Sequence, residues 1–436
     1  MIKHLINKVG RELLGNSMWL LIDKIFRLAL GLFVSVIVAR YLGAERVGIW
    51  NYALAIFAFF SFFPSLGLEY IAPREFVKED RKAGEMISTI WILKILGGSL
   101  GVLFALIIMS IIKGPSDPII FLIFIVTSGF LFQSFDVIDY YFQSKLSQKR
   151  SVIARMIAFA VIATYKSILV YKGADLVWFV ASSTFEFFIA AIGLTIAFWS
   201  WSEKPPLFKF NWSLAKSLLK DSLPFSASAI LLLIYYRVDQ IMVTEMLGEA
   251  ENGIYSITVK FFEYFMVLPY VLVSSFYPVI SKSYHEDETK FKAGLKQLYS
   301  LLTYLAIAAI LGLWFLGPWV MEFLYGDEFK GSGEALQIIS LSIYPVFLGI
   351  ASGNYLIIRN KKRFTFIRSF AGLVINIILN FSFIPIMGIE GAAWASLVSN
   401  CVSTFMIIFI KDNHNHLQLF LSPFNVKSIR RFFKYE

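Results

Sequence analysis

The chain has 436 residues, of which 58% are apolar and only 16% are charged, and its mean hydropathy is +0.69. Soluble domains carry about 25% charged residues, so a soluble protein of this composition would expose large apolar patches. The net charge of +10 would suggest nucleic acid for a soluble protein, but cytoplasmic loops rich in Lys and Arg account for it in a membrane protein. The composition therefore indicates a membrane protein, and nucleic acid is not an expected partner.

Cysteine and histidine content limits the chemistry further. The single cysteine, Cys401, excludes an intramolecular disulfide, and the four histidines are too scattered to form a recognisable metal site. We therefore expect no cofactor and no metal ligand set.

The first fifteen residues alternate apolar and basic types. Ile2 and Ile6 fall on one face of a helix, while Lys3 and Lys8 lie off it. The pattern favours an amphipathic segment over residues 1–15 that lies on the membrane surface. A polar tail without regular structure fits it nearly as well.

Twelve stretches are long and apolar enough to be membrane-spanning helices, each of which needs about 20 mostly apolar residues. Their pattern predicts an all-α, polytopic membrane protein. The predicted spans are 17–39, 49–69, 87–112, 118–142, 151–171, 175–199, 222–247, 253–280, 295–317, 334–358, 364–386 and 388–410.

The longest polar connector, at 201–221, contains two prolines and four lysines. We interpret it as a cytoplasmic linker between two lobes of six helices each, over 16–200 and 222–410. The remaining segment, 411–436, is predicted to be a basic cytoplasmic tail.

Basic residues alternate between successive loops. With the N-terminus placed in the cytoplasm, the inside segments carry 27 Lys and Arg residues and the outside segments carry five. Cytoplasmic loops of membrane proteins show this excess. The alternation supports the number of helices and predicts a multi-pass protein of the cytoplasmic membrane with both termini inside.

A short motif occurs at the same place in each predicted lobe. The first span is followed by Leu42-Gly43 and, after four intervening residues, Gly48-Ile49. The seventh ends at Leu247-Gly248, with Gly253-Ile254 at the same spacing. The two copies are 205 residues apart. We interpret them as parallel internal repeats of six helices.

Ionisable residues inside the predicted spans are the main functional signal. A charge at the bilayer centre costs at least ~2.5–3.5 kcal/mol, so such residues usually face a bundle interior or a wet cavity. The residues concerned are Asp23, Lys24, Arg27, Lys94, Asp136, Asp139, Arg155, Lys166, Glu186, Arg237, Asp239, Lys260 and Glu263.

Depth separates these charges into two groups. Lys94, Arg155 and Asp139 lie near the cytoplasmic face, where extending to the headgroups is as plausible as an interior role. Four others lie near mid-span, where we favour function over a structural ion pair: Arg27, Glu186, Arg237 and Asp239.

Spacing predicts local ion pairs on two helices. Asp23 and Arg27 are four residues apart, and Lys260 and Glu263 are three apart, so each pair shares a helix face. Each spacing places opposite charges side by side, which lowers the cost of burying them.

Polar residues form stripes on two other helices. Gln133, Asp136 and Tyr140 mark one stripe, and Asn376 and Asn380 mark another at a spacing of four. Amide stripes inside membranes more often join helices than bind ligands.

Several motifs together resemble the signature of the bacterial and archaeal polysaccharide flippase family. The resemblance covers about residues 10–410. It is carried by Val38-Ala39-Arg40-Tyr41-Leu42-Gly43-Ala44-Glu45-x2-Gly48-Ile49, by Arg237-x-Asp239 with Leu247-Gly248 and Gly253-Ile254-Tyr255, and by Gly388-Ile389-x-Gly391-Ala392-Ala393.

This family belongs to the multidrug/oligosaccharidyl-lipid/polysaccharide exporter (MOP) superfamily. The resemblance implies two six-helix bundles around a central cavity and transport by alternating access. It implies translocation of polyprenyl-pyrophosphate-linked oligosaccharides, such as O-antigen units, for cell-surface polysaccharide synthesis. The implied partners are that substrate, membrane lipid, H⁺ or Na⁺ as an optional coupling ion, and membrane proteins of polysaccharide assembly. A catalytic site is not implied.

The same resemblance suggests roles for the charges. Arginines in the first helix of the related lipid II flippase make Arg27 the natural anion-binding candidate. The candidate substrate-binding residues are Arg27, Arg237, Lys260, Lys166 and Glu186. The candidates for ion coupling or cavity ion pairs are Asp23, Lys24, Asp136, Asp239 and Glu263.

Two other functions are weighed against this one. A cation-coupled multidrug exporter of the same fold would favour an acidic, aromatic cavity, whereas bases slightly outnumber acids in the first lobe. A membrane glycosyltransferase or polymerase would need a sizeable extramembrane loop, and the longest predicted outside loop, at 318–333, is short.

Overall fold

The computed structural model describes residues 2–206, 209–409 and 416–424, and some side chains, including those of residues 2–17, lie outside this description. The described part is almost entirely helical and contains no strand. The predicted amphipathic face of 1–15 and most of the tail 411–436 lie outside the described residues.

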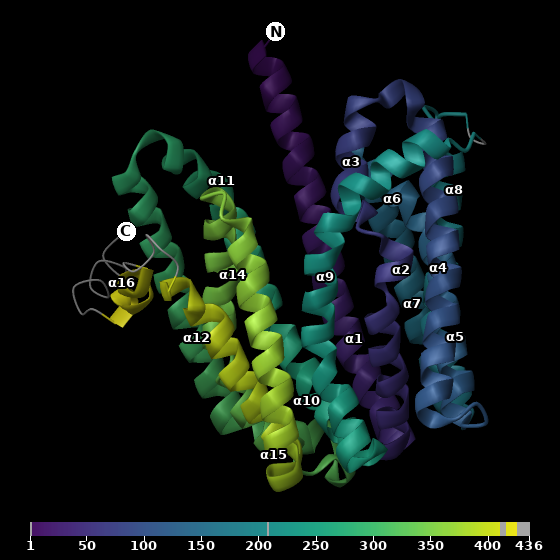
Figure 1. The fold of residues 1–436 in the computed structure, drawn as a ribbon, viewed down its shortest axis with the longest axis vertical. Coiled ribbons are helices and arrows are strands. Elements are labelled where there is room, and N and C mark those ends of the chain that lie inside the picture. The colour runs from purple at the N-terminus through teal and green to yellow at the C-terminus, as the bar shows by residue number, and fades with distance from the viewer. Residues whose placement is uncertain (1, 207–208, 410–415, 425–436) are drawn as a thin grey trace. The chain divides into compact units, whose positions relative to one another are not determined.

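The helices follow one another with short connections (Figure 1). They are α1 (Ile2–Phe60), α2 (Phe62–Ser65), α3 (Leu68–Lys78), η1 (Asp80–Lys82), α4 (Ala83–Lys113), α5 (Pro118–Phe132), η2 (Gln133–Phe135), α6 (Asp136–Ser144), α7 (Lys149–Tyr171), α8 (Leu176–Trp199), α9 (Trp212–Leu247), α10 (Glu249–Phe265), α11 (Val267–Glu286), α12 (Glu288–Tyr325), η3 (Asp327–Phe329), α13 (Ser332–Ser340), α14 (Ile343–Ile358), α15 (Lys362–Phe405), η4 (Met406–Phe409), α16 (His416–Leu421) and η5 (Ser422–Phe424).

Every predicted span coincides with helix in the described part of the chain. By length and apolar composition, seven helical segments within that part could cross a membrane, or eight if the bent pair α13–α14 counts as one span. The long helix α1 covers the span 17–39 and the first part of 49–69, and α15 covers 364–386 and most of 388–410. Gly43 (φ 76°) and Gly388 (φ 61°) break them at the predicted boundaries, because only glycine adopts this backbone region without strain.

Four predicted spans contain a short interruption, and two of these, 118–142 and 253–280, still lie within single apolar segments long enough to cross a membrane. The span 49–69 is interrupted between Phe60 and Leu68, where Pro64 and the positive φ of Gly67 turn the chain. The interruptions in the other three lie at η2, between α10 and α11, and between α13 and α14.

The chain forms two compact units. The first comprises residues 1–42 and 49–237, and the second comprises 43–48 and 238–436. The first unit therefore runs past the predicted linker 201–221, because α9 already begins at Trp212.

Within the first unit, α4 packs on α5, α5 on α8, and α7 on α8. Within the second, α12 packs on α11, α13 and α14, and α14 packs on α15. In each unit the helices lie side by side along much of their length (Figure 1), so polar side chains on neighbouring helices can meet inside a bundle.

The two copies of the repeated motif contact each other inside the second unit. Gly43 (φ 76°, ψ 171°) and Gly248 (φ 99°, ψ 176°) adopt nearly the same conformation. A Cβ atom added to Gly48 would lie 1.7 Å from the carbonyl oxygen of Glu249, and one added to Gly253 would lie 1.9 Å from that of Ala44. Both positions therefore require glycine for a close approach of the backbones.

Candidate functional site

Arg27 on α1 is the centre of an ion-pair network in the first unit. Its Nε donates to Asp23 Oδ1 at 3.0 Å, and its Nη1 donates to Glu186 Oε1 on α8 at 3.0 Å. Its Nη2 donates to the carbonyl oxygen of Arg155 on α7 at 3.2 Å, and the guanidinium lies 4.9 Å from the ring centre of Phe159. One forked side chain thus joins three helices, as the planar guanidinium allows.

A second arginine continues the network toward α6. Nη2 of Arg155 lies 2.9 Å from Asp136 Oδ1 and 3.0 Å from Asp139 Oδ2. The predicted pair Asp23–Arg27 is confirmed, but the links from Arg27 to Glu186 and from Arg155 to two aspartates join residues far apart in sequence.

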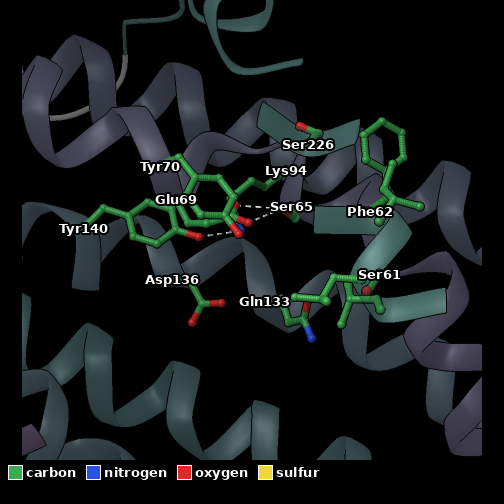
Figure 2. A pocket seen from close by; sticks show the side chains of 13 residues that line it. Ser61, Phe62, Ser65, Glu69, Tyr70, Lys94, Gln133, Asp136, Tyr140 and Ser226 are labelled. Carbon is green, nitrogen blue, oxygen red and sulfur yellow. Dashed lines mark hydrogen bonds between the residues drawn. The ribbon is translucent and has the colours of Figure 1, made fainter. Parts of the chain in front are cut away.

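The network borders a cavity of about 400 Å³ within the first unit, where a few polar and charged side chains interrupt a mainly apolar lining. Lys94 on α4 contributes its ammonium group to the lining, and its Nζ donates to the hydroxyl of Tyr140 at 3.3 Å. Figure 2 shows Lys94, Tyr140 and Glu69 gathered together, with Asp136 and Gln133 beside them. Asp136 both lines this cavity and pairs with Arg155, so the ion network and the cavity are continuous.

Lys94 does not extend to the membrane surface, because only 2% of it is exposed. The sequence leaves the role of Lys94 open and gives no signal for Glu69, which ends a predicted span. In the structure Glu69 lies in the first turn of α3 and lines the cavity. The feature of the sequence that could have located the cavity is the polar stripe Gln133, Asp136 and Tyr140, because all three residues line it.

Two further lysines of the first unit lie outside this cavity lining. Lys166 on α7 places its Nζ 5.0 Å from the ring centre of Trp50, and Glu186 attracts it electrostatically. Lys24 on α1 is exposed.

Asp239 on α9 is the centre of a different polar site, in the second unit. Only 7% of Asp239 is exposed. Its carboxylate accepts hydrogen bonds from Asn380 Nδ2 at 2.7 Å, from the hydroxyl of Tyr255 at 3.1 Å and from the hydroxyl of Ser396. All three donors are neutral, and Asn380 is linked in turn to Asn376 at 3.1 Å. The amide stripe of α15 thus meets a buried acid.

The other candidates of the second half do not join Asp239. Lys260 and Glu263 lie on α10, where Lys260 is exposed and Glu263 is half-buried. Arg237 is half-buried at the end of the first unit. None of the three is a hydrogen-bond partner of Asp239 among the described residues, so the structure resolves the candidates into two separate sites.

Comparison with known proteins decides the family. A family model described as polysaccharide biosynthesis protein matches residues 13–284, which is more than half of the chain. The chain belongs to this polysaccharide biosynthesis family. A second model, MatE, matches residues 224–382, so the family's relation to the MatE transporters extends into the second unit.

A curated relative and two solved structures agree with this assignment. The probable flippase AglR of Haloferax volcanii is 28% identical over 181 residues, which are 40% of this chain and 37% of that protein. An inward-facing multidrug resistance MATE transporter of the MOP superfamily has a TM-score of 0.74 at 13% identity, covering 92% of this chain and 96% of that one. The lipid II flippase MurJ, in an inward closed conformation, has a TM-score of 0.71 at 16% identity, covering 96% and 92%.

The polysaccharide biosynthesis family member therefore has the MOP fold, and it is a multi-pass membrane protein. By their names the relatives are flippases and transporters rather than catalysts. This agrees with the expectation that the chain is not an enzyme.

Proposed function

We propose that this chain is a flippase that moves polyprenyl-pyrophosphate-linked oligosaccharides across the cytoplasmic membrane, for cell-surface polysaccharide synthesis. The observation that carries the proposal is the charge network of the first unit, in which Arg27, Arg155 and carboxylates from three helices lie beside a cavity and within predicted spans. Family membership supports it. Charges held inside a membrane bundle mark a substrate pathway by default.

In this mechanism Arg27 meets the pyrophosphate. Guanidinium groups bind phosphate oxygens through paired, charge-assisted hydrogen bonds. Arg27 holds Asp23 and Glu186 here, so an arriving pyrophosphate would exchange with one of these carboxylates. Lys166 and Arg237, both in the first unit, would help to balance the anion, and alternating access would release it on the other side. Lys260, in the second unit, stays a candidate contact that the sequence alone suggests.

The membrane potential would assist this direction of transport. With the cytoplasm negative, outward movement of negative charge gains about 2.3 kcal/mol per charge per 100 mV. The positive-inside pattern supports placing both termini in the cytoplasm, where the lipid-linked unit is assembled. Other membrane proteins of polysaccharide assembly would then receive the unit outside.

Replacement of both arginines tests the assignment in cells. The Arg27→Gln/Arg237→Gln double variant should lose export of the surface glycan while still present in the membrane, because neither glutamine can pair with pyrophosphate. Export should be measured per amount of membrane protein. Wild-type export by the double variant would remove both arginines from the substrate path.

Asp239 supports coupling of transport to a cation. The carbonyl oxygen of Asn380 is buried without a hydrogen-bond partner among the described residues, next to the Asp239 carboxylate. Rotation of the Asn380 amide by half a turn would direct this oxygen toward the carboxylate. The oxygens of Asp239, Asn380 and Ser396 would then suit Na⁺, a hard cation that prefers oxygen ligands, or a proton on the carboxylate.

Ligand-linked stabilisation tests this coupling. A cation that binds the folded protein raises its thermal stability by mass action. We expect Na⁺, compared with choline at equal ionic strength, to raise the unfolding temperature of the purified protein, and Asp239→Asn to abolish the rise. If Na⁺ has no effect on the wild type, unfolding temperatures of the wild type and Asp239→Asn should be compared between pH 5 and 8 to test for a proton. If neither Na⁺ nor pH has an effect that depends on Asp239, coupling at this site is excluded.

Cation-coupled drug export is the second candidate, and the match of the MatE model to residues 224–382 favours it. A buried carboxylate among neutral donors would serve a drug exporter equally well. Proteoliposomes offered a lipid-linked oligosaccharide or a cationic dye separate the two functions, since a flippase should move the first and a drug exporter the second.

A further inference from the structure

The cavity of the first unit has the volume of a ligand site and a mixed lining, in which a few charged and polar side chains interrupt mainly apolar surface. It is formed by α2, the start of α3, α4, the η2–α6 junction and the first-unit part of α9 (Figure 2). Its volume of about 400 Å³ lies within the range of roughly 300–1,000 Å³ that small-molecule pockets occupy. All of its lining residues belong to one compact unit, so the cavity does not depend on the arrangement of the two units.

Lys94 supplies unused donors to this cavity. An ammonium group has three hydrogens to donate, and the single hydrogen bond of Lys94 in the described part of the chain goes to Tyr140. Its Nζ also lies 5.3 Å from the centre of the Tyr140 ring. A charged group that is only 2% exposed is costly unless its remaining donors are satisfied, so a polar ligand would lower that cost.

Acceptors surround the same space. Asp136 pairs with Arg155 through Oδ1, which leaves Oδ2 to accept from a ligand. Glu69 accepts from the hydroxyl of Ser65 at 2.6 and 2.8 Å. The side-chain amide of Gln133 has no hydrogen-bond partner in the part of the chain that the structure describes and can both donate and accept.

The charge balance of the lining discriminates between ligands. A free anion would meet two carboxylates, Glu69 and Asp136, and a cation would meet Lys94 with Arg155 behind Asp136. A wholly apolar molecule would leave all of these groups unsatisfied. A neutral molecule with many hydroxyl groups satisfies donors and acceptors together, because each hydroxyl can do both.

Aromatic side chains complete the lining. Tyr70, Tyr140 and Phe62 place rings at the cavity, and Tyr70 is the most exposed of the three. A sugar ring has apolar C–H faces as well as hydroxyl edges, so it fits a lining of rings and hydrogen-bonding groups. Lipid tails lack this combination.

We propose that this cavity binds an uncharged sugar unit, with Lys94 and Gln133 donating to its hydroxyls and Asp136 accepting from them. The inference rests on the proposed function for the source of the sugar, which would be the glycan of the lipid-linked substrate. It separates recognition of the glycan, at this cavity, from that of the pyrophosphate, at Arg27.

Binding of free sugars to the full-length purified protein tests the site without any lipid. The probes are methyl glycosides of the common hexoses, 6-deoxyhexoses and N-acetylhexosamines, with methyl phosphate as the anionic comparison, followed by saturation-transfer NMR. We expect at least one glycoside to bind, and Lys94→Met and Gln133→Leu each to weaken it by about tenfold, as the loss of a hydrogen bond to a charged or fixed polar group implies.

Lys113→Met is the matched control. Lys113 lies on the same helix and also places its Nζ over a tyrosine ring, 5.4 Å from the centre of Tyr52, but it does not line the cavity. It should leave glycoside binding unchanged. The sugar site is overturned if no glycoside of the panel binds, if methyl phosphate competes with the bound glycoside, or if both cavity variants bind like the wild type.

The same preparation separates this inference from the proposed function. A wild-type protein that flips lipid-linked oligosaccharide but binds no glycoside retains the function and loses the sugar site. A protein that binds glycosides through Lys94 but flips no lipid-linked substrate retains the site and loses the function.

Discussion

At the scale of single residues, Arg27 is the side chain whose surroundings most constrain the mechanism. It satisfies two carboxylates, Asp23 and Glu186, and the carbonyl oxygen of Arg155. Removing one partner of an ion pair inside a bundle leaves the other charge without compensation. Arg27 therefore stabilises the first unit in addition to any contact with substrate.

A double-mutant cycle separates these two contributions. Because Arg27 and Glu186 are 30% and 27% exposed, we expect Arg27→Ala to destabilise the protein by only about 1–3 kcal/mol. When Arg27→Ala is made in protein that already carries Glu186→Ala, the loss of stability should be smaller, by a coupling energy of at least ~0.5 kcal/mol. Unfolding in detergent measures both, and strictly additive effects would show that the pair contributes nothing.

Some contacts of these residues could be predicted from the sequence and others could not. The pair of Asp23 with Arg27 was predictable because one helical turn separates the two residues. The partners Glu186 and Arg155, and the meeting of Asp239 with Asn380, depend on how helices pack, which hydropathy does not specify. Lys94 could not be distinguished by its depth from a residue that reaches the headgroups.

At the scale of elements, a close contact between two backbone segments accounts for the glycines of the repeated motif. Gly48 and Gly253 each lie where a side chain would meet a carbonyl oxygen, and the amide of Asn252 donates to the carbonyl oxygen of Gly48 at 3.0 Å. Repetition of the motif thus reflects two loops that pack against each other.

Alanine at these glycines should separate the loops. Gly253→Ala places a methyl group against the Ala44 carbonyl, so the backbone must move, and we expect a loss of stability of about 1–3 kcal/mol, as for overpacking elsewhere. Gly312→Ala is the control, since nothing lies within 4 Å of an added Cβ there. Equal unfolding temperatures for the two variants would argue against the close contact.

The start of α12 offers a pH-dependent element outside the spans. The backbone amides of Thr289 and Lys290 donate to the Asp287 side chain at 2.8 and 3.3 Å and hold the pKa of this carboxyl below its usual value. A carboxyl with a lowered pKa stabilises the folded state above its unfolded pKa, about 3.9, and this contribution is lost as pH falls through the lower folded value.

Hydrogen exchange at the two amides measures this cap. At pH 7 Asp287→Ala should reduce protection of the Thr289 and Lys290 amides, whereas Asp287→Asn should retain much of it because asparagine also caps helices. The difference between wild type and Asp287→Ala should shrink below about pH 4. A difference that persists unchanged at lower pH would show that the charge of the cap is irrelevant.

At the scale of the whole molecule, hydropathy predicted the fold class because the thickness of the hydrocarbon layer fixes the length of apolar helices. The twelve spans and the breaks at Gly43 and Gly388 follow from this rule. The interruption near Pro64 agrees with the proline there, whereas the one at η2 contains no proline or glycine and could not be predicted from hydropathy. Residues at both interruptions line the first-unit cavity, which is the proposed sugar site.

Transport of the intact substrate tests the central claim most directly. Proteoliposomes containing the purified chain, with a fluorescent polyprenyl-pyrophosphate-linked oligosaccharide in the inner leaflet, should expose that substrate to an external glycosidase faster than protein-free vesicles. The phosphorylated polyprenyl carrier without sugar should cross more slowly. Equal exposure in vesicles with and without protein, under a Na⁺ gradient, a pH gradient and an imposed potential, would contradict the account.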